Sequence, residues 1–283
     1  MKEALYYEKI HGKRVHCHLC PYECRLPPGG KGACGVRQNV DGILYSLVYG
    51  KTTGLALDPI EKKPLYHYHP GEQILSLGTR GCNLHCDFCQ NWHISQEVDG
   101  PMENITSEEV VKRAKELGSF GIAYTYNEPF IWYEFVLDTA KLARQNGLKN
   151  VLVTNGFVNR DPLEGMLPYI DAMNIDLKAF DEDFYVKVCK GRLKPVLDVI
   201  KISAKACHVE LTNLIIPTLN DSESSVRKMV DWIYSNLGAG VPLHLSRYFP
   251  CYNMDLPPTP IETLKRAEHI AKEKLKYVYI GNM

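Results

Sequence analysis

From about residue 71 onward, short apolar runs alternate with longer amphipathic stretches, and this alternation constrains the fold more than any other feature. The apolar runs that predict strands are 73–78, 121–126, 150–154, 172–177, 208–216, 242–246 and 276–280. The stretches with helical periodicity are 107–117, 129–145, 194–206, 222–237 and 261–274. Strands that alternate with helices of this length predict right-handed βαβ units and a parallel sheet.

Periodicity alone leaves two α/β architectures open, an open doubly wound sheet and a partial or complete (β/α) TIM-like barrel. Polar residues gather after successive predicted strands: a cysteine loop, then Asn127 and Glu128, Thr154 and Asn155, Asp176 and Lys178, and His244 near the sixth. The carboxyl ends of barrel strands meet on one face, so this distribution favours a barrel over residues 71–283. Residues 1–70 are expected to form a small cysteine-rich N-terminal module, with 51–70 as its linking segment.

The composition excludes several classes of protein. No apolar run reaches the ~18 residues that a membrane span needs, and residues 1–8 lack the apolar segment of a secretory signal, so we expect a cytoplasmic protein. The formal net charge is +0, which argues against a surface built for nucleic-acid phosphates. Ten cysteines without a secretory signal indicate metal ligation in a reducing compartment rather than disulfides.

Three cysteines follow the first predicted strand with the spacing C-x3-C-x2-C, at Cys82, Cys86 and Cys89. Three thiolates on one loop can hold three corners of a [4Fe–4S] cube and leave the fourth iron free for a small chelating cofactor. The spacing resembles that of radical S-adenosylmethionine (SAM) enzymes. A chance triplet or a three-thiolate zinc site is the alternative.

A second group of four cysteines lies in the N-terminal module, at Cys17, Cys20, Cys24 and Cys34. Four thiolates this close can complete a tetrahedral Zn²⁺ site or hold an auxiliary iron–sulfur cluster, and the spacing leaves both open. His16 and His18 are expected to flank the site rather than serve as ligands. The scattered Cys189, Cys207 and Cys251 are expected to be buried apolar fillers.

If SAM binds the open iron, its methionyl group, ribose and adenine need partners from the other strand ends. Glu128 is placed to accept from the amino group, and Thr154 and Asn155 offer a hydroxyl and an amide. Asp176 and Lys178 share one face of an extended segment. Each of these residues also has an ordinary structural explanation, as a helix cap, a turn or a solvated ion pair.

The chain as a whole resembles the pyruvate formate-lyase activating-enzyme group of radical SAM enzymes, and within it the radical SAM member of the AmmeMemoRadiSam system. The runs that carry the resemblance are Cys17–Pro21, Cys82–Trp92, Tyr124–Pro129, Val153–Gly156, Asn174–Lys178 and Pro242–Tyr248. It implies that Cys82, Cys86 and Cys89 ligate a [4Fe–4S] cluster. It also implies that Asn127, Glu128, Lys178 and His244 contact SAM. Phe88 precedes Cys89 and can either shield the edge of the cluster or serve as a simple hydrophobic anchor.

The resemblance further implies that Thr154 and Asp176 bind a monovalent cation, although Val153 replaces an aspartate of that site. It implies an electron donor of the flavodoxin or ferredoxin type, and Memo-like and Ammecr-like companion proteins. Three functions remain open: hydrogen abstraction from a small molecule, protein or RNA; activation of a glycyl-radical enzyme; and a non-catalytic zinc-binding scaffold.

Overall fold

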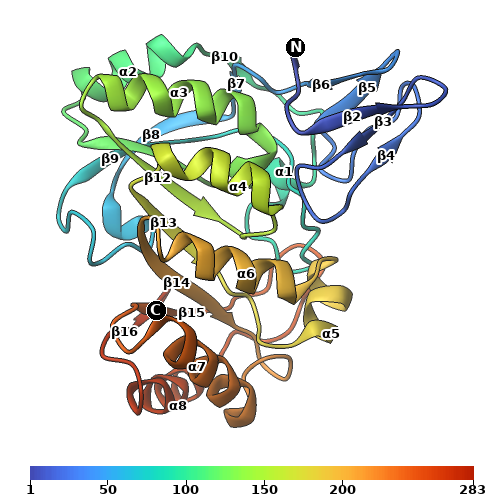
Figure 1. The fold of residues 1–283 in the computed structure, drawn as a ribbon. Helices are drawn as coiled ribbons and strands as arrows, with labels where there is room; N and C mark the ends of the chain where they lie inside the picture. The colour runs from blue at the N-terminus through green and yellow to red at the C-terminus, as the bar shows by residue number, and fades with distance from the viewer.

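A parallel sheet forms the centre of the computed structural model, which describes all 283 residues (Figure 1). Its strands are β9 (Gln73–Gly78), β11 (Gly121–Tyr124), β12 (Lys149–Thr154), β13 (Ala172–Asp176), β14 (His208–Ile215), β15 (Leu243–Arg247) and β16 (Val278–Gly281). They neighbour one another in chain order, and β8 (Gly54–Pro59) adds an antiparallel edge beside β9. The seven strands predicted from the sequence are confirmed. A doubly wound sheet would reverse its order at a switch point, so this order identifies a barrel. The two edge strands, β8 and β16, do not pair, and the barrel is partial.

Helices cover the outer face of the sheet (Figure 1). They are α2 (Ser107–Glu116), α3 (Tyr133–Gln145), α4 (Arg160–Met166), α6 (Leu193–Ser203), α7 (Glu223–Leu237) and α8 (Ile261–Lys272). Thr106 and Glu109 form a capping box at the start of α2. No helix is both long enough and apolar enough to cross a membrane. The sequence did not predict α4 or two short helices near the cysteine loop, α1 (Trp92–Ser95) and α5 (Glu182–Phe184).

The N-terminal module consists of two small antiparallel sheets that lie against one end of the barrel (Figure 1). One contains β1 (Lys2–Glu3), β6 (Ile43–Ser46) and β5 (Arg37–Val40), and the other β2 (Tyr7–Ile10), β3 (Arg14–Cys17) and β4 (Arg25–Leu26). A short pair, β7 (Lys51–Thr52) with β10 (Glu103–Asn104), joins the module to the barrel.

The prediction that residues 51–70 are a linking segment of the N-terminal module is wrong. Residues 54–59 form β8 and pair with β9 along its whole length. The following 3-10 turn brings Ile60 and then Leu65 into a buried cluster with four strand residues, Ile74, Ala123, Val151 and Ala172. The segment belongs to the barrel because its backbone bonds and apolar side chains are satisfied there, and the module ends near residue 50.

Candidate active site

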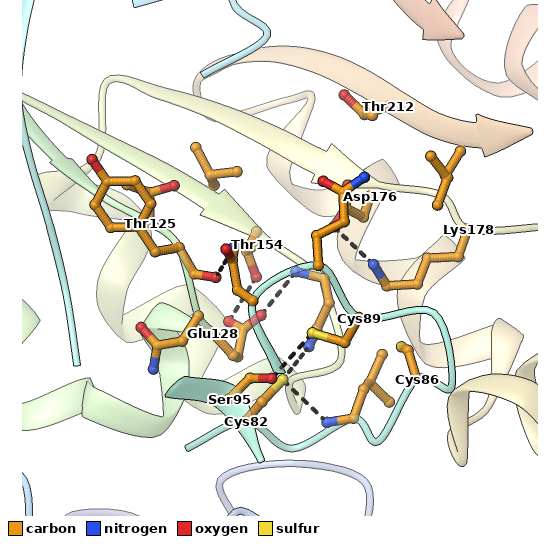
Figure 2. Close-up of a pocket in the computed structure, with 18 of the residues that line it drawn as sticks. Cys82, Cys86, Cys89, Ser95, Thr125, Glu128, Thr154, Asp176, Lys178 and Thr212 are labelled. Atoms are coloured by element: carbon orange, nitrogen blue, oxygen red, sulfur yellow. Dashed lines mark hydrogen bonds and ion pairs between the residues drawn. The ribbon is translucent and has the colours of Figure 1, made fainter. Parts of the chain in front are cut away.

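A cavity of about 330 Å³ lies at the carboxyl ends of the barrel strands (Figure 2). Its walls include most of the candidate site residues that the sequence placed after successive strands. These are Cys82, Cys86, Phe88, Cys89, Asn127, Glu128, Thr154, Asn155, Asp176 and Lys178. The barrel therefore brings residues that are far apart in the sequence together at one site.

The cysteine loop presents all three of its sulfurs to this cavity. Gly81 allows the loop to leave β9, because its φ of +95° favours glycine and a Cβ there would lie 2.7 Å from the carbonyl oxygen of Cys34. The Sγ of Cys82 accepts from the backbone N–H of Leu84 at 3.4 Å. The Sγ of Cys89 lies 3.1 Å from the hydroxyl of Ser95 in α1.

Glu128 is buried in the wall of the cavity, where it caps the 3-10 turn Pro129–Trp132. Its carboxylate accepts from the Phe130 N–H at 3.0 Å, the Thr154 hydroxyl at 2.8 Å and the Asn155 N–H at 2.8 Å. Burial raises the pKa of Glu128 to about 7, although these three hydrogen bonds lower it. The carboxyl group is thus held rigidly and is ready to accept a further donor from a cationic or amino-bearing ligand.

Asn155 connects Glu128 to the cysteine loop, because its backbone N–H donates to Glu128 and its side chain reaches the loop. Its side-chain amide donates to Asn83 at 3.0 Å and approaches the Sγ of Cys82 at 3.6 Å. Asn127 acts in a similar way, because it accepts from the Thr79 N–H and donates to the Gly81 carbonyl. The side-chain amide of Asn127 is therefore occupied in holding the loop, although the residue lines the cavity.

Asp176 and Lys178 face each other on the opposite wall, with 2.9 Å between the carboxylate and the ammonium (Figure 2). Burial alone would lower the pKa of Lys178, but the charges of Asp176 and of the nearby thiols Cys86 and Cys189 raise it well above its ordinary value. The Lys178 ammonium also lies 5.7 Å from the ring centroid of Phe88. A permanent cation is thus held near the cysteine loop.

His244 does not line the cavity. It lies on β15 two residues before Ser246, which does, and its Nε2 lies 2.6 Å from the carboxylate of Glu210. Tyr66 and Tyr279 pack on its ring. The expected contact between His244 and SAM is therefore not supported by the geometry, because its ring nitrogen is bonded deeper in the barrel.

Several residues near the cavity were not singled out from the sequence. Lys62, Lys63, Tyr126, Thr212 and Ser246 line it, and Ser95 approaches Cys89. Cys189, expected to be an apolar filler, is fully buried at the end of a π-helical turn (Tyr185–Cys189), and its carbonyl accepts from the His85 N–H of the cysteine loop at 3.0 Å. Cys207 and Cys251 are half-buried. Position along a strand could have indicated Thr212 and Ser246, but no sequence signal marks Cys189.

The four N-terminal cysteines also come together, in the module that packs against the cysteine loop. A Cβ on Gly32 would lie 3.8 Å from both the Cys24 and the Cys34 sulfurs. Burial raises the pKa of the Cys20 thiol, and negative charge on the other three sulfurs raises it further. The imidazoles of His16 and His18 turn away, toward Glu8 and Glu23. The expectation that these histidines flank the site agrees with this arrangement.

A family model described as the Radical SAM superfamily matches residues 76–233, which is more than half of the chain. The chain belongs to the radical SAM superfamily. This membership implies a [4Fe–4S] cluster and SAM, and the donor set of the cavity fits them: three thiols of one loop open beside a buried carboxylate and a lysine. It also identifies an enzyme, so the zinc-binding scaffold is set aside.

Individual relatives support this placement. Over 100% of this chain and 86% of the relative, the sequence is 48% identical to the uncharacterized protein MJ0808 of Methanocaldococcus jannaschii. It is 26% identical to the pyruvate formate-lyase-activating enzyme of Clostridium pasteurianum, over 54% of this chain and 66% of that enzyme. Homology to activating enzymes is thus confirmed, but it covers about half of the present chain. The particular closeness to the AmmeMemoRadiSam member stays a prediction.

Solved structures agree on the fold. A domain of a pyruvate-formate lyase-activating enzyme from Bacteroides vulgatus superposes with a TM-score of 0.51 at 20% identity, covering 57% of this chain and 99% of that domain. TYW1 with a lysine–pyruvate adduct superposes with a TM-score of 0.56 at 16% identity, covering 81% and 87% of the two chains. Both likenesses concern the fold alone, and they confirm the partial barrel.

Proposed function

We propose that this radical SAM enzyme uses Cys82, Cys86 and Cys89 to hold a [4Fe–4S] cluster and binds SAM in the adjoining cavity to abstract hydrogen from a substrate. The observation that carries the proposal is the meeting of the three thiols with Glu128 and the Asp176–Lys178 pair around one cavity. When bound, the cluster supplies the electron that cleaves SAM to methionine and a 5′-deoxyadenosyl radical. The remaining work belongs to the protein.

That work is to bind, to orient and to exclude water. Glu128 accepts from the amino group of the methionyl moiety, and its three internal hydrogen bonds fix the direction of its free lone pairs. Thr154 positions Glu128 through its hydroxyl. Lys178 offers a permanent positive charge to a carboxylate or ribose oxygen, and Phe88 shields the loop from solvent.

A monovalent cation beside SAM, bound by Thr154 and Asp176, is not favoured by this geometry. The Thr154 hydroxyl donates to Glu128 and accepts from the Gly156 N–H at 3.1 Å. The ammonium of Lys178 already neutralises Asp176. We therefore assign Asp176 the role of positioning Lys178.

A second candidate function is activation of a glycyl-radical enzyme, which the sequence similarity to activating enzymes favours. We propose a reduced flavodoxin or ferredoxin as the electron donor in either case, and the Memo-like and Ammecr-like companions remain a prediction. Ten free cysteines are typical of a protein from a reducing compartment, and we propose the cytoplasm. A glycyl-radical signal in the EPR spectrum of a co-incubated partner would select activation over modification of another substrate.

The test is anaerobic reconstitution followed by an assay for 5′-deoxyadenosine. We expect product with SAM and dithionite present, and none from the variant C82A/C86A/C89A. The matched control is C207A, which removes a half-buried thiol outside both cysteine groups. Iron-loaded wild-type protein that forms no 5′-deoxyadenosine would refute the proposal.

A further inference from the structure

We propose that Cys17, Cys20, Cys24 and Cys34 hold a second [4Fe–4S] cluster rather than a zinc ion, and that electrons pass through it to the SAM-binding site. The identity of the metal group rests only on the N-terminal module. The electron-transfer role rests in addition on the proposed function.

The sulfurs are spaced more widely than a single bound metal ion requires. A Zn–S bond of about 2.3 Å in a tetrahedron requires sulfurs about 3.8 Å apart. No three cysteine sulfurs in the chain lie within 4.8 Å of one another, whereas one oxygen of Glu8 and a nitrogen each of His16 and His18 do. The sulfurs of Cys82, Cys86 and Cys89, which we assign to a cluster, likewise do not all lie within 4.8 Å of one another. A cube of four irons needs this wider arrangement, because each sulfur binds a different corner.

The four cysteines nevertheless lie close together in the module. Gly32 has the sulfurs of Cys24 and Cys34 near it, and Ala33 donates its N–H to the Cys24 sulfur at 3.5 Å. The Gly32 N–H donates to the Arg37 carbonyl at 2.8 Å, and the Cys17 N–H donates to the Cys24 carbonyl at 2.9 Å. The four cysteines therefore belong to neighbouring turns of one small module.

Arg37 provides an independent indication of a ligand in the module. Its side chain is 1% exposed, and its Nε is buried without a hydrogen-bond partner. The other guanidinium nitrogens bond to Glu134 and to the Leu5 carbonyl. The Arg37 backbone lies beside the turn that carries the Cys24 and Cys34 sulfurs. A buried and unpartnered N–H on this residue is a donor suited to a cluster sulfur, and such donors tune the potential of iron–sulfur clusters.

The module touches the radical SAM loop directly, which suggests a path for electrons. The Ala33 carbonyl lies 3.0 Å from the Nε2 of His85, a residue of the C-x3-C-x2-C run. The Cys34 carbonyl abuts Gly81, next to Cys82. One electron passes from a reduced flavodoxin or ferredoxin to the N-terminal cluster, and from there to the second cluster, without any bond forming or breaking.

The metal content of C82A/C86A/C89A tests the identity of the group, because this variant keeps only the N-terminal site. After anaerobic purification we expect about four irons and four sulfides per chain and a visible absorption band that dithionite bleaches. Zinc with sulfur ligands at about 2.3 Å by X-ray absorption would overturn the proposal, as would folded protein without iron. If this variant does not fold, the wild type decides, with about eight irons per chain expected and about four contradicting the proposal.

The path is tested by supplying electrons in two ways to C20S. We expect SAM cleavage driven by a reduced flavodoxin to fall at least tenfold, while cleavage driven by dithionite, which reduces the second cluster directly, is retained. Equal rates with the flavodoxin in C20S and wild type would refute the relay. Failure of both proteins with dithionite would instead refute the proposed SAM chemistry, so the two failures are distinguishable. C207A is again the control.

Discussion

The ion pair between Arg37 and Glu134 joins the N-terminal module to the barrel and should be costly to break. Arg37 lies on β5 and Glu134 on α3, the charged groups are 3.0 Å apart, and both side chains are at most 3% exposed. Glu134 also accepts from the Leu5 N–H at 2.8 Å. In E134Q this acceptor remains but the buried guanidinium loses its counter-charge. We expect a loss of about 3–5 kcal/mol in the free energy of unfolding.

For a chain of this size that loss corresponds to a fall of about 5–10 °C in Tm, measurable by calorimetry or circular dichroism. The double variant R37M/E134Q removes the orphaned charge, and we expect it to be more stable than E134Q. E116Q is the control, since Glu116 pairs with Lys112 on the exposed face of α2 and should melt with the wild type.

The size of the effect should depend on the metal group in the module. A cluster with four thiolates carries negative charge beside Arg37 and partly replaces the missing carboxylate. We therefore expect E134Q to lose more stability after the iron is removed with a chelator than before. An E134Q protein that melts within 1 °C of the wild type in both states would refute the reasoning about the buried charge.

Three further outcomes follow from the geometry. T154V removes the hydroxyl that donates to Glu128, and SAM should bind about tenfold more weakly by equilibrium dialysis, with T154S close to the wild type. G156A places a side chain at a φ of +69° and 3.0 Å from a buried neighbour, and should cost about 1–3 kcal/mol in urea unfolding, whereas G240A, with open space around it, should be nearly neutral. Burial alone would raise the pKa of Glu210, but hydrogen bonds from two histidines and two backbone amides hold it at about 2, below its usual 4.5. The contribution of Glu210 to the free energy of unfolding is therefore fully present above about pH 4.5 and is lost as the pH falls toward 2. In E210Q the free energy of unfolding should change less with pH over this range. An acid unfolding transition that is the same in E210Q and in the wild type would contradict this.

The sequence predicted the parallel strands well because each is a buried apolar run between helices with clear periodicity. It missed β8 because that strand is a half-exposed antiparallel edge that begins with Gly54 and ends with Pro59, so its pattern is typical of a loop. It missed α4 because a helix of seven residues is too short to show periodicity.

Within the candidate site, the sequence predicted which strand ends carry polar groups, but it did not predict how deep in the barrel each side chain lies. His244 and Ser246 share one face of β15, yet two residues separate them by about 7 Å along the strand, and only Ser246 lines the cavity. Cys189 was missed for a different reason. Its approach to the cysteine loop depends on a π-helical turn, a local irregularity that periodicity does not predict.

The contact of Gly81 with the Cys34 carbonyl has a consequence for how the protein matures. Ribosomes release the N-terminus first, so the four-cysteine module leaves the exit tunnel before the loop that rests on it. An assembly factor that delivers iron–sulfur clusters would therefore meet the N-terminal site before the second site. Once the N-terminal site is filled, the folded module would provide the surface on which the loop of Cys82, Cys86 and Cys89 packs.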